Sequence, residues 1–240
     1  QLRNKMKIFA LSDLHGKLPT HESLNIEDCD VLCIAGDICP DFRVSGGYEQ
    51  KQWLKTNFVP WAEIFITDGM VKDVVFIGGN HDWYLEEIFE TDQEAGFRKT
   101  LPEHIHYLRD DFVVIDGKKF YGTPWTPEFY NWAFMEYEGE LDKIFEKIPT
   151  DTDVLLSHGP AQGFNDLVEG RGRPLGSKAL TRNIHRARPT LAVFGHIHTG
   201  SHKPSVIKHR GNTTATTTLV NVSLLDEAYI RAFHPFEFDI

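Results

Sequence analysis

Apolar residues recur along the chain in short runs, and each run ends in a polar cluster. The runs cover residues 7–11, 31–35, 74–77, 154–156 and 191–194. They have the length of strands, are rich in β-branched residues and are bounded by glycine, which predicts buried strands. Because open α/β sheets bind ligands beyond the carboxyl ends of their strands, the polar clusters are candidates for a functional site.

Three segments between these runs have apolar residues at helical spacing. Helices are predicted over residues 48–65, 137–148 and 177–187. Pro60 should kink or divide the first helix, and the last should end before Pro189.

The remaining apolar segments predict further strands. Asp116 and Gly117, between FVVID and KKFYG, predict a type I′ hairpin over residues 112–121. Strands are also expected over residues 205–208, 216–222 and 232–238, with no helix between them. The alternation of strands and helices, followed by an all-β tail, predicts a mixed α/β architecture with two packed sheets flanked by helices.

The composition is that of a globular protein. The chain has 240 residues, of which 41% are hydrophobic and 25% charged, enough to bury a substantial core. We expect one domain over residues 1–240, with residues 1–5 either a tag remnant or a native extension without a function. No apolar run approaches the roughly 18 residues that span a bilayer, and the first residues lack the apolar segment of a secretory signal. The expected location is therefore the cytoplasm.

Charge and cysteine content limit the classes of partner. The formal net charge of −10 disfavours a protein whose main task is to hold a nucleic-acid backbone. A small anionic substrate stays open, because bound divalent cations make a site locally positive. The three cysteines have no CxxC spacing, which favours a reducing compartment. Cys33 is expected in the core, and Cys39 is a weak candidate ligand because a thiolate suits zinc better than an oxygen-rich site.

Three polar clusters in the first half of the chain offer oxygen and nitrogen ligands. Asp13 and His15 form a D-x-H pair whose side chains share a face if the segment is extended. Asp37 follows a glycine, and its two carboxylate oxygens could reach two cations. Asn80 and His81, in GGNHD, place a carbonyl oxygen next to an imidazole. Taken singly, such clusters are also common in turns.

Two clusters in the second half of the chain add three imidazoles. His158 lies in SHGP, and His196 and His198 lie in GHIH, a spacing that lets both side chains point the same way. A single histidine at a strand end is usually structural. The occurrence of all five motifs together supports the prediction of a metal site. D-x-H, GD, GNHD, SHG and GHxH each follow a strand-like run, in this order.

This order of motifs, from Asp13 to His198, resembles that of the calcineurin-like metallophosphoesterase superfamily. The HGP and FGHIH segments and the all-β tail are most similar to the metallophosphoesterase-domain group and, more loosely, to class III cyclic nucleotide phosphodiesterases. The resemblance implies a four-layer α/β/β/α sandwich of two mixed sheets. It also implies two metal ions with these ligands: Asp13, His15, Asp37 and His198 for one, and Asp37, Asn80, His158 and His196 for the other, with Asp37 bridging.

The implied donors also indicate which metals and which chemistry to expect. Carboxylate, carboxamide and imidazole donors suit Mn²⁺, Fe or Zn²⁺ better than Ca²⁺ or Mg²⁺, and Mn²⁺ is the expected ion. Two such cations lower the pKa of a shared water, so that hydroxide attacks the phosphorus in line. The resemblance makes His81 the proton donor to the leaving group, or at least a residue that hydrogen-bonds the transition state, and Asp82 is the candidate to orient it.

Some residues around these motifs bear on the substrate. Protein Ser/Thr phosphatases carry GDxxDRG, whereas this chain reads GDICPDF, with Pro40 in place of the second Asp, which argues against that role. Arg171 and Arg173 are candidates for a phosphate clamp, because a guanidinium can bind phosphate through two hydrogen bonds; a solvated basic loop is the alternative. Trp83 could stack a nucleobase, although a core position is favoured.

The expected function is a phosphodiesterase that hydrolyses a small nucleotide ester, for example a cyclic nucleotide. A phosphomonoesterase, a nuclease of the same superfamily and a non-catalytic metal-binding scaffold are the alternatives. The expected partner is a small phosphate ester, without a membrane or a stably bound nucleic acid.

Overall fold

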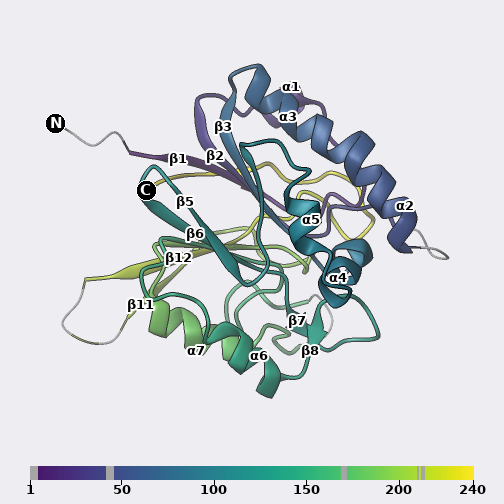
Figure 1. Ribbon diagram of the computed structural model, residues 1–240. Coiled ribbons are helices and arrows are strands. Elements are labelled where there is room, and N and C mark those ends of the chain that lie inside the picture. The colour runs from purple at the N-terminus through teal and green to yellow at the C-terminus, as the bar shows by residue number, and fades with distance from the viewer. Residues whose placement is uncertain (1–4, 42–45, 169–171, 210, 212–213) are drawn as a thin grey trace.

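A computed structural model describes residues 5–41, 46–168, 172–209, 211 and 214–240. Among these residues the strands form two large mixed sheets, of five and six strands, and a small sheet of two (Figure 1). The first sheet has the order β13-β1-β2-β3-β4. Its strands are β1 (Lys7–Leu11), β2 (Cys29–Ala35), β3 (Val71–Ile77), β4 (Ile105–Tyr107) and β13 (Phe236–Asp239). The first four are parallel, and β13 pairs with β1 in the antiparallel direction.

The second sheet has the order β11-β12-β10-β9-β6-β5. Its strands are β5 (Asp111–Ile115), β6 (Lys118–Thr123), β9 (Val154–Ser157), β10 (Leu191–Phe194), β11 (Ser205–Lys208) and β12 (Thr216–Asn221). The four inner strands are parallel, and the edge strands β5 and β11 are antiparallel to their neighbours. The small sheet consists of β7 (Thr126–Pro127) and β8 (Met135–Glu136).

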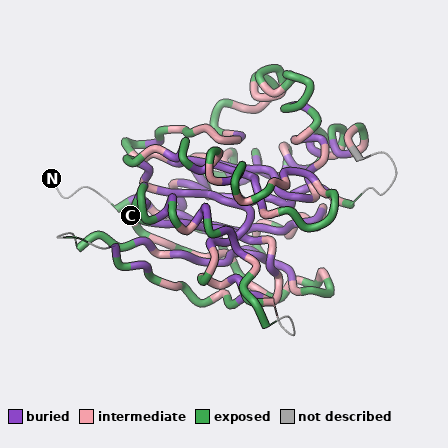
Figure 2. Tube along the Cα trace, turned by 90° about the horizontal axis from the view of Figure 1, so that it is seen from below, coloured by how far each residue is buried: buried purple, intermediate pink, exposed green. Residues whose placement is uncertain are grey.

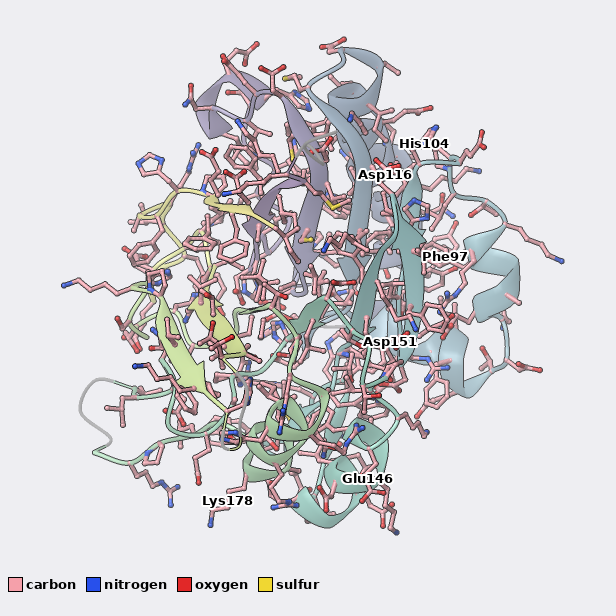
Figure 3. The ribbon with its side chains drawn as sticks, turned by 90° about the vertical axis from the view of Figure 1, so that its left-hand side faces the viewer. Phe97, His104, Asp116, Glu146, Asp151 and Lys178 are labelled. Carbon is pink, nitrogen blue, oxygen red and sulfur yellow. The ribbon has the colours of Figure 1, made fainter. Side chains whose placement is uncertain are left out.

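Helices cover the outer face of each large sheet. Those beside the first sheet are α1 (His21–Leu24), α2 (Gly46–Trp53), the π-helix η1 (Leu54–Phe58), α3 (Val59–Thr67), α4 (Trp83–Glu90) and α5 (Glu94–Arg98). Those beside the second sheet are α6 (Glu138–Phe145) and α7 (Lys178–Ala187). Figure 3 shows this second helical layer at one edge of the molecule, marked by Glu146 after α6 and by Lys178 at the start of α7. The predicted four-layer α/β/β/α architecture is confirmed.

Alternating side chains build a separate core on each face of the sheets. In β1, Ile8 and Ala10 face the second sheet, whereas Phe9 and Leu11 belong to the core beneath the helices. The same alternation repeats along the inner strands, as the period of two along a strand requires. Because both faces are covered, these strands are almost continuously buried (Figure 2), which explains why they appear in the sequence as apolar runs.

Most of the predicted elements are present, with shifted ends. The helix predicted over residues 48–65 is divided into α2, η1 and α3, and Pro60 lies in the first turn of α3. The Ser177 side chain accepts a hydrogen bond from the Leu180 N–H and so caps α7. The hairpin is confirmed, with φ of 46° at Asp116 and 78° at Gly117.

Among the described residues, six elements were not predicted, and one prediction needs correction. The unpredicted elements are the helices α1, α4 and α5 and the strands β4, β7 and β8. The strand predicted over residues 232–238 begins only at Phe236, and it joins the first sheet rather than the other tail strands. In the part of the chain that the structure describes, no helix is both long enough and apolar enough to cross a membrane.

Candidate metal centre

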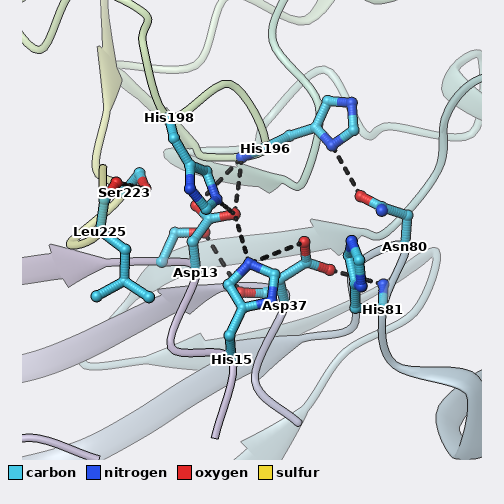
Figure 4. Close-up of polar contacts among 12 residues, drawn as sticks. Asp13, His15, Asp37, Asn80, His81, His196, His198, Ser223 and Leu225 are labelled. Atoms are coloured by element: carbon cyan, nitrogen blue, oxygen red, sulfur yellow. Dashed lines mark hydrogen bonds and ion pairs between the residues drawn. The ribbon is translucent and has the colours of Figure 1, made fainter. Parts of the chain in front are cut away.

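The residues predicted as metal ligands lie just beyond the carboxyl ends of parallel strands. In the first sheet, one pair follows β1, Asp37 follows β2 and Asn80 follows β3; in the second sheet, His158 follows β9 and two histidines follow β10. Figure 4 shows Asp13, His15, Asp37 and His198 pointing toward one another. The two sheets thus bring together residues that are up to 185 positions apart, from Asp13 to His198.

Left-handed backbone turns direct several of these side chains into the site. φ is 58° at Asp13, 44° at His15, 50° at Asp37 and 67° at His196, a region that is uncommon for residues other than glycine. The Asp13 N–H donates to the Gly36 carbonyl at 3.0 Å, and the His15 N–H donates to the Asp37 carbonyl at 2.9 Å. These bonds join the turns after β1 and β2, so neighbouring structure holds the unusual conformation in place.

Gly79 lets the turn after β3 approach the turn after β2 closely. A Cβ atom at this position would lie 2.4 Å from the backbone nitrogen of Asp37 and 2.7 Å from Cε1 of His158. Gly36 is similarly enclosed, since a Cβ atom there would lie 2.6 Å from Nδ1 of His158. The glycines before Asp37 and Asn80 are therefore required by packing.

One cluster of donor atoms consists of Asp13, His15 and His198. Their ligand atoms lie within 4.8 Å of one another. Nε2 of His198 is 3.3 Å from Oδ1 of Asp13, and Nε2 of His15 is 4.0 Å from the same oxygen. Donors that bind one cation at roughly 2.0–2.2 Å lie about 3–4 Å apart. The cluster therefore has the size that one divalent ion requires.

A second cluster consists of Asp37, His158 and His196, whose ligand atoms also lie within 4.8 Å of one another. Oδ1 of Asn80 joins it, 2.9 Å from Nε2 of His158 and 2.7 Å from Nδ1 of His196. Oδ2 of Asp37 is 3.2 Å from Nε2 of His158 and 3.6 Å from Nε2 of His15 in the first cluster. Asp37 thus lies between the two clusters, where its carboxylate could bridge two ions.

Hydrogen bonds around the clusters fit metal ligation. Nδ1 of His158 donates to the Ala35 carbonyl and Nδ1 of His198 donates to the Asp226 carbonyl, both at 2.9 Å. Nε2 of each ring then faces its cluster, as is usual for a histidine ligand. Neither nitrogen of His15 has a hydrogen-bond partner among the described residues, although its side chain is only 3% exposed. A buried polar group without a partner is costly, and a metal ion would satisfy this one.

Burial and charge shift the pKa values of the clustered groups. Burial raises the pKa of Asp13, but the hydrogen bond and charge of His198 outweigh it and lower this pKa to about 2. Burial lowers the pKa of His158 and of His198, but Asp37 and Asp13 respectively raise each to about 9. Burial and the charge of His158 lower the pKa of His196 to about 4. The raised pKa values of His158 and His198 thus reflect the attraction of the neighbouring carboxylates for positive charge.

His81 lies beside the clusters and contacts a carboxylate that sequence analysis did not identify. The backbone N–H of His81 donates to Oδ1 of Asp37 at 2.8 Å, and Nδ1 of its ring is 2.5 Å from Oδ1 of Asp41. Burial lowers the pKa of His81, but Asp37 and Asp41 raise it to about 9. His15, Asp41 and His81 form a third group of donors close enough to hold an ion. The signal for Asp41 was an acidic residue directly after Pro40, one position beyond the second Asp of GDxxDRG.

Asp82, the candidate to orient His81, binds backbone groups instead of the imidazole. Its carboxylate accepts hydrogen bonds from the N–H groups of Ile38 (3.1 Å), Cys39 (2.8 Å) and Gly79 (2.7 Å). Burial and the charge of Asp37 raise the pKa of Asp82 to about 6. Asp82 therefore fastens the loop after β2 to the turn after β3, and the geometry assigns the orienting contact to Asp41.

A cavity of about 570 Å³ opens over the clusters. Arg173 lies in its wall and is the only lysine or arginine among the described lining residues; Arg171 lies outside the described residues. Trp83 packs against the core, as favoured by the sequence analysis, and does not line the cavity. The aromatic residues that line the cavity are instead Phe129, Trp132 and Tyr229. The ring centroid of Tyr229 is 4.6 Å from that of His15. No motif spacing marks these aromatic residues in the sequence.

Comparisons with known proteins bear on the family and the fold. Residues 6–200 match the family model described as calcineurin-like phosphoesterase. The chain is 32% identical over 253 residues to metallophosphoesterase domain-containing protein 1 of Homo sapiens, covering 98% of this chain and 71% of the relative, and equally so to that of Mus musculus. A solved structure, that of TT1561 of Thermus thermophilus, has a similar fold, with a TM-score of 0.56, 14% identity, and coverage of 98% of this chain and 99% of the other.

Proposed function

This chain belongs to the calcineurin-like phosphoesterase family and is a metal-dependent phosphoester hydrolase, and we propose that it is a dinuclear phosphodiesterase for small nucleotide or cyclic nucleotide esters. The observation that carries the proposal is the convergence of two donor clusters on Asp37 at the floor of one cavity. The ligands are those predicted: Asp13, His15, Asp37 and His198 for one ion, and Asp37, Asn80, His158 and His196 for the other.

The donor set favours a transition metal. It combines carboxylates and one carboxamide with imidazoles, which suits Mn²⁺, with Fe or Zn²⁺ as alternatives. When bound, two such ions supply hydroxide at neutral pH and neutralise the phosphoryl oxygens.

His81 is the residue proposed to protonate the leaving group. Hydrolysis forms a bond between phosphorus and the oxygen of water and breaks the bond between phosphorus and the ester oxygen, which needs a proton as it leaves. Asp41, 2.5 Å from Nδ1, directs Nε2 of His81 away from itself and favours the protonated ring. This arrangement supports a proton donor at neutral pH.

The charge of the cavity favours a diester over a monoester. Apart from histidines, Arg173 is the only cationic side chain among the described lining residues, whereas Glu128 and Glu227 bring negative charge. A diester carries one negative charge and a monoester close to two near neutral pH, so the diester demands less compensation. The volume of about 570 Å³ is within the usual range for small-molecule sites.

The proposal is tested by turnover of bis(p-nitrophenyl) phosphate and p-nitrophenyl phosphate with the Mn²⁺-loaded protein. We expect hydrolysis of the diester. With a dialkyl diester, whose leaving oxygen needs a proton, kcat of His81→Ala should fall by roughly 10²–10⁴-fold, the usual contribution of a general acid. The loss with the chromogenic diester should be smaller, because p-nitrophenolate leaves without being protonated. Metal content should stay unchanged in this variant. His104→Ala is the matched control, because His104 is a 54% exposed histidine paired with Asp73 outside the cavity. Activity on the monoester alone, or full turnover of the dialkyl diester by His81→Ala, would contradict the proposal.

A further inference from the structure

Three aromatic side chains form a cluster at the mouth of the cavity. We call Phe129, Tyr130 and Trp132 the aromatic platform; their ring centroids are 4.4, 6.0 and 5.5 Å apart. Phe129 is 37% exposed and Tyr130 70% exposed, and Phe129 and Trp132 line the cavity. Aromatic surface left in water beside a binding cavity is available to a ligand.

Hydrogen bonds set the position of the platform relative to the metal centre. The platform lies between β7 and β8, below α4 in Figure 1. Immediately after Trp132, the Ala133 N–H donates to the backbone carbonyl of Asn80 at 3.1 Å, and the Phe134 N–H donates to Oε1 of Glu86 in α4 at 2.7 Å. Phe134 is buried, and its ring packs against that of Trp125 with centroids 5.5 Å apart. The platform is therefore fastened to the turn that carries Asn80 and His81.

Trp132 lies on the side of the site where the leaving group departs. Its ring centroid is 5.0 Å from that of His81, and the two planes are inclined by 42°. A proton donor must lie within hydrogen-bond reach of the leaving oxygen, so the group attached to that oxygen extends past His81. This step rests on the proposed role of His81, and it brings the leaving group to the platform.

The shape and charge of the platform select a flat, uncharged group. The three rings contact one another, which leaves no space between them for an ammonium ion, as an aromatic cage would need. Residues 126–136 contain no lysine or arginine but contain Glu128 and Glu136, so a second phosphate would be repelled. Exposed aromatic faces of this kind stack nucleobases.

We infer that the aromatic platform, chiefly Trp132, is a specificity subsite that stacks the base of a nucleoside leaving group. A linear diester bound in this way is cut at the bond between phosphorus and the nucleoside oxygen. The products are a free nucleoside and the phosphate monoester of the other alcohol.

Adenosine 5′-methyl phosphate tests the inference, because its two alcohols have similar leaving ability. We expect the Mn²⁺-loaded protein to release adenosine and methyl phosphate in preference to AMP and methanol. The counterpart that carries 1-deoxyribose in place of adenosine should be cut with a kcat/KM lower by roughly 5- to 150-fold, the equivalent of 1–3 kcal/mol of stacking.

Variants separate the platform from the catalytic machinery. Trp132→Ala should lower kcat/KM for adenosine 5′-methyl phosphate far more than for the base-free diester, so that the preference for the base is lost, and Trp132→Phe should retain most of that preference. Tyr48→Ala, which removes an aromatic ring that is 69% exposed on α2, should leave kcat/KM unchanged for both diesters. Equal losses on both diesters in Trp132→Ala, or release of AMP by the parent protein, would overturn the inference.

A binding measurement keeps the inference separate from the proposed function. If neither diester is hydrolysed, the diesterase proposal fails. Calorimetric binding of adenosine 5′-methyl phosphate and of its base-free counterpart then still tests the platform. Tighter binding of the base-bearing ligand that is lost in Trp132→Ala supports the subsite, and equal affinities refute it.

Discussion

A single methyl group added at Gly79 should disable the metal centre. In Gly79→Ala the new Cβ atom would lie 2.4 Å from the backbone nitrogen of Asp37, about 1 Å closer than an ordinary contact of 3.4 Å. It would also lie 2.3 Å from Oδ1 of Asp37 and 2.7 Å from Cε1 of His158. A backbone atom cannot rotate away, so the turn that carries the bridging carboxylate must move.

The magnitude follows from the cost of overpacking a buried site. Such substitutions cost about 1–3 kcal/mol of stability, and for a domain of this size each kcal/mol lowers Tm by about 2–4 °C. We therefore expect Gly79→Ala to lower Tm by roughly 2–12 °C in the chelator-treated protein. The loss of Tm should be larger with Mn²⁺ present, because displacement of Asp37 also removes the stabilisation that ligand binding provides.

Thermal unfolding with and without Mn²⁺, together with metal content by mass spectrometry, checks this prediction. Gly139→Ala is the matched control, since Gly139 in α6 has no atom within 4 Å of a new Cβ, and alanine is the better helix former by up to about 1 kcal/mol. A Gly79→Ala protein with the parental Tm and two bound ions would refute the reasoning.

Three further predictions concern proton balance and reactivity. Asp41→Asn should lower kcat by about 10- to 100-fold with metal content intact, because the contact that orients His81 and raises its pKa is weakened; an unchanged pH profile of kcat would count against this. Mn²⁺ binding to chelator-treated protein at pH 7 should release protons, since the pKa values of His158 and His198 are about 9 and a ligating imidazole must be neutral. The affinity for Mn²⁺ should therefore rise with pH up to about 9. Calorimetry in buffers of different protonation enthalpy measures the number of protons released. Binding that releases no protons and does not depend on pH would contradict this prediction. The cysteines are buried, and burial raises the pKa of Cys29 to about 12, so iodoacetamide at pH 8 should modify them only after unfolding; rapid labelling of the native protein would contradict the fold.

Much of the fold could be predicted because its central strands are covered on both faces. A strand such as β10 then contains only apolar residues, and its polar continuation marks the carboxyl end of the sheet. The pairing of β13 with β1 could not be predicted in this way, because nothing local to residues 236–239 specifies a partner more than 200 positions away. The signal for α4 was present, since Leu85 and Ile88 have helical spacing and face the core, but it lies directly after a motif that suggested a turn.

The residues of the site, like the elements of the fold, include some that could be predicted from the sequence and some that could not. The donors lie within short motifs, so residue type and order were sufficient to propose them. Asp41 and Trp132 reach His81 only through the folded chain, and neither has a fixed spacing from it in the sequence. Asp82 illustrates the opposite error, because adjacency to His81 suggested a contact that the direction of its side chain excludes.

The origin of the donors in two different sheets has a mechanical consequence. Ions held between the turn after β2 and those after β9 and β10 would act as a non-covalent cross-link between the two halves of the sandwich. Chelation should then increase amide hydrogen exchange in both sheets along the seam where they meet, and not merely in the loops that carry the ligands. The same ions that make the chemistry feasible would in this way also determine how rigidly the molecule is held together.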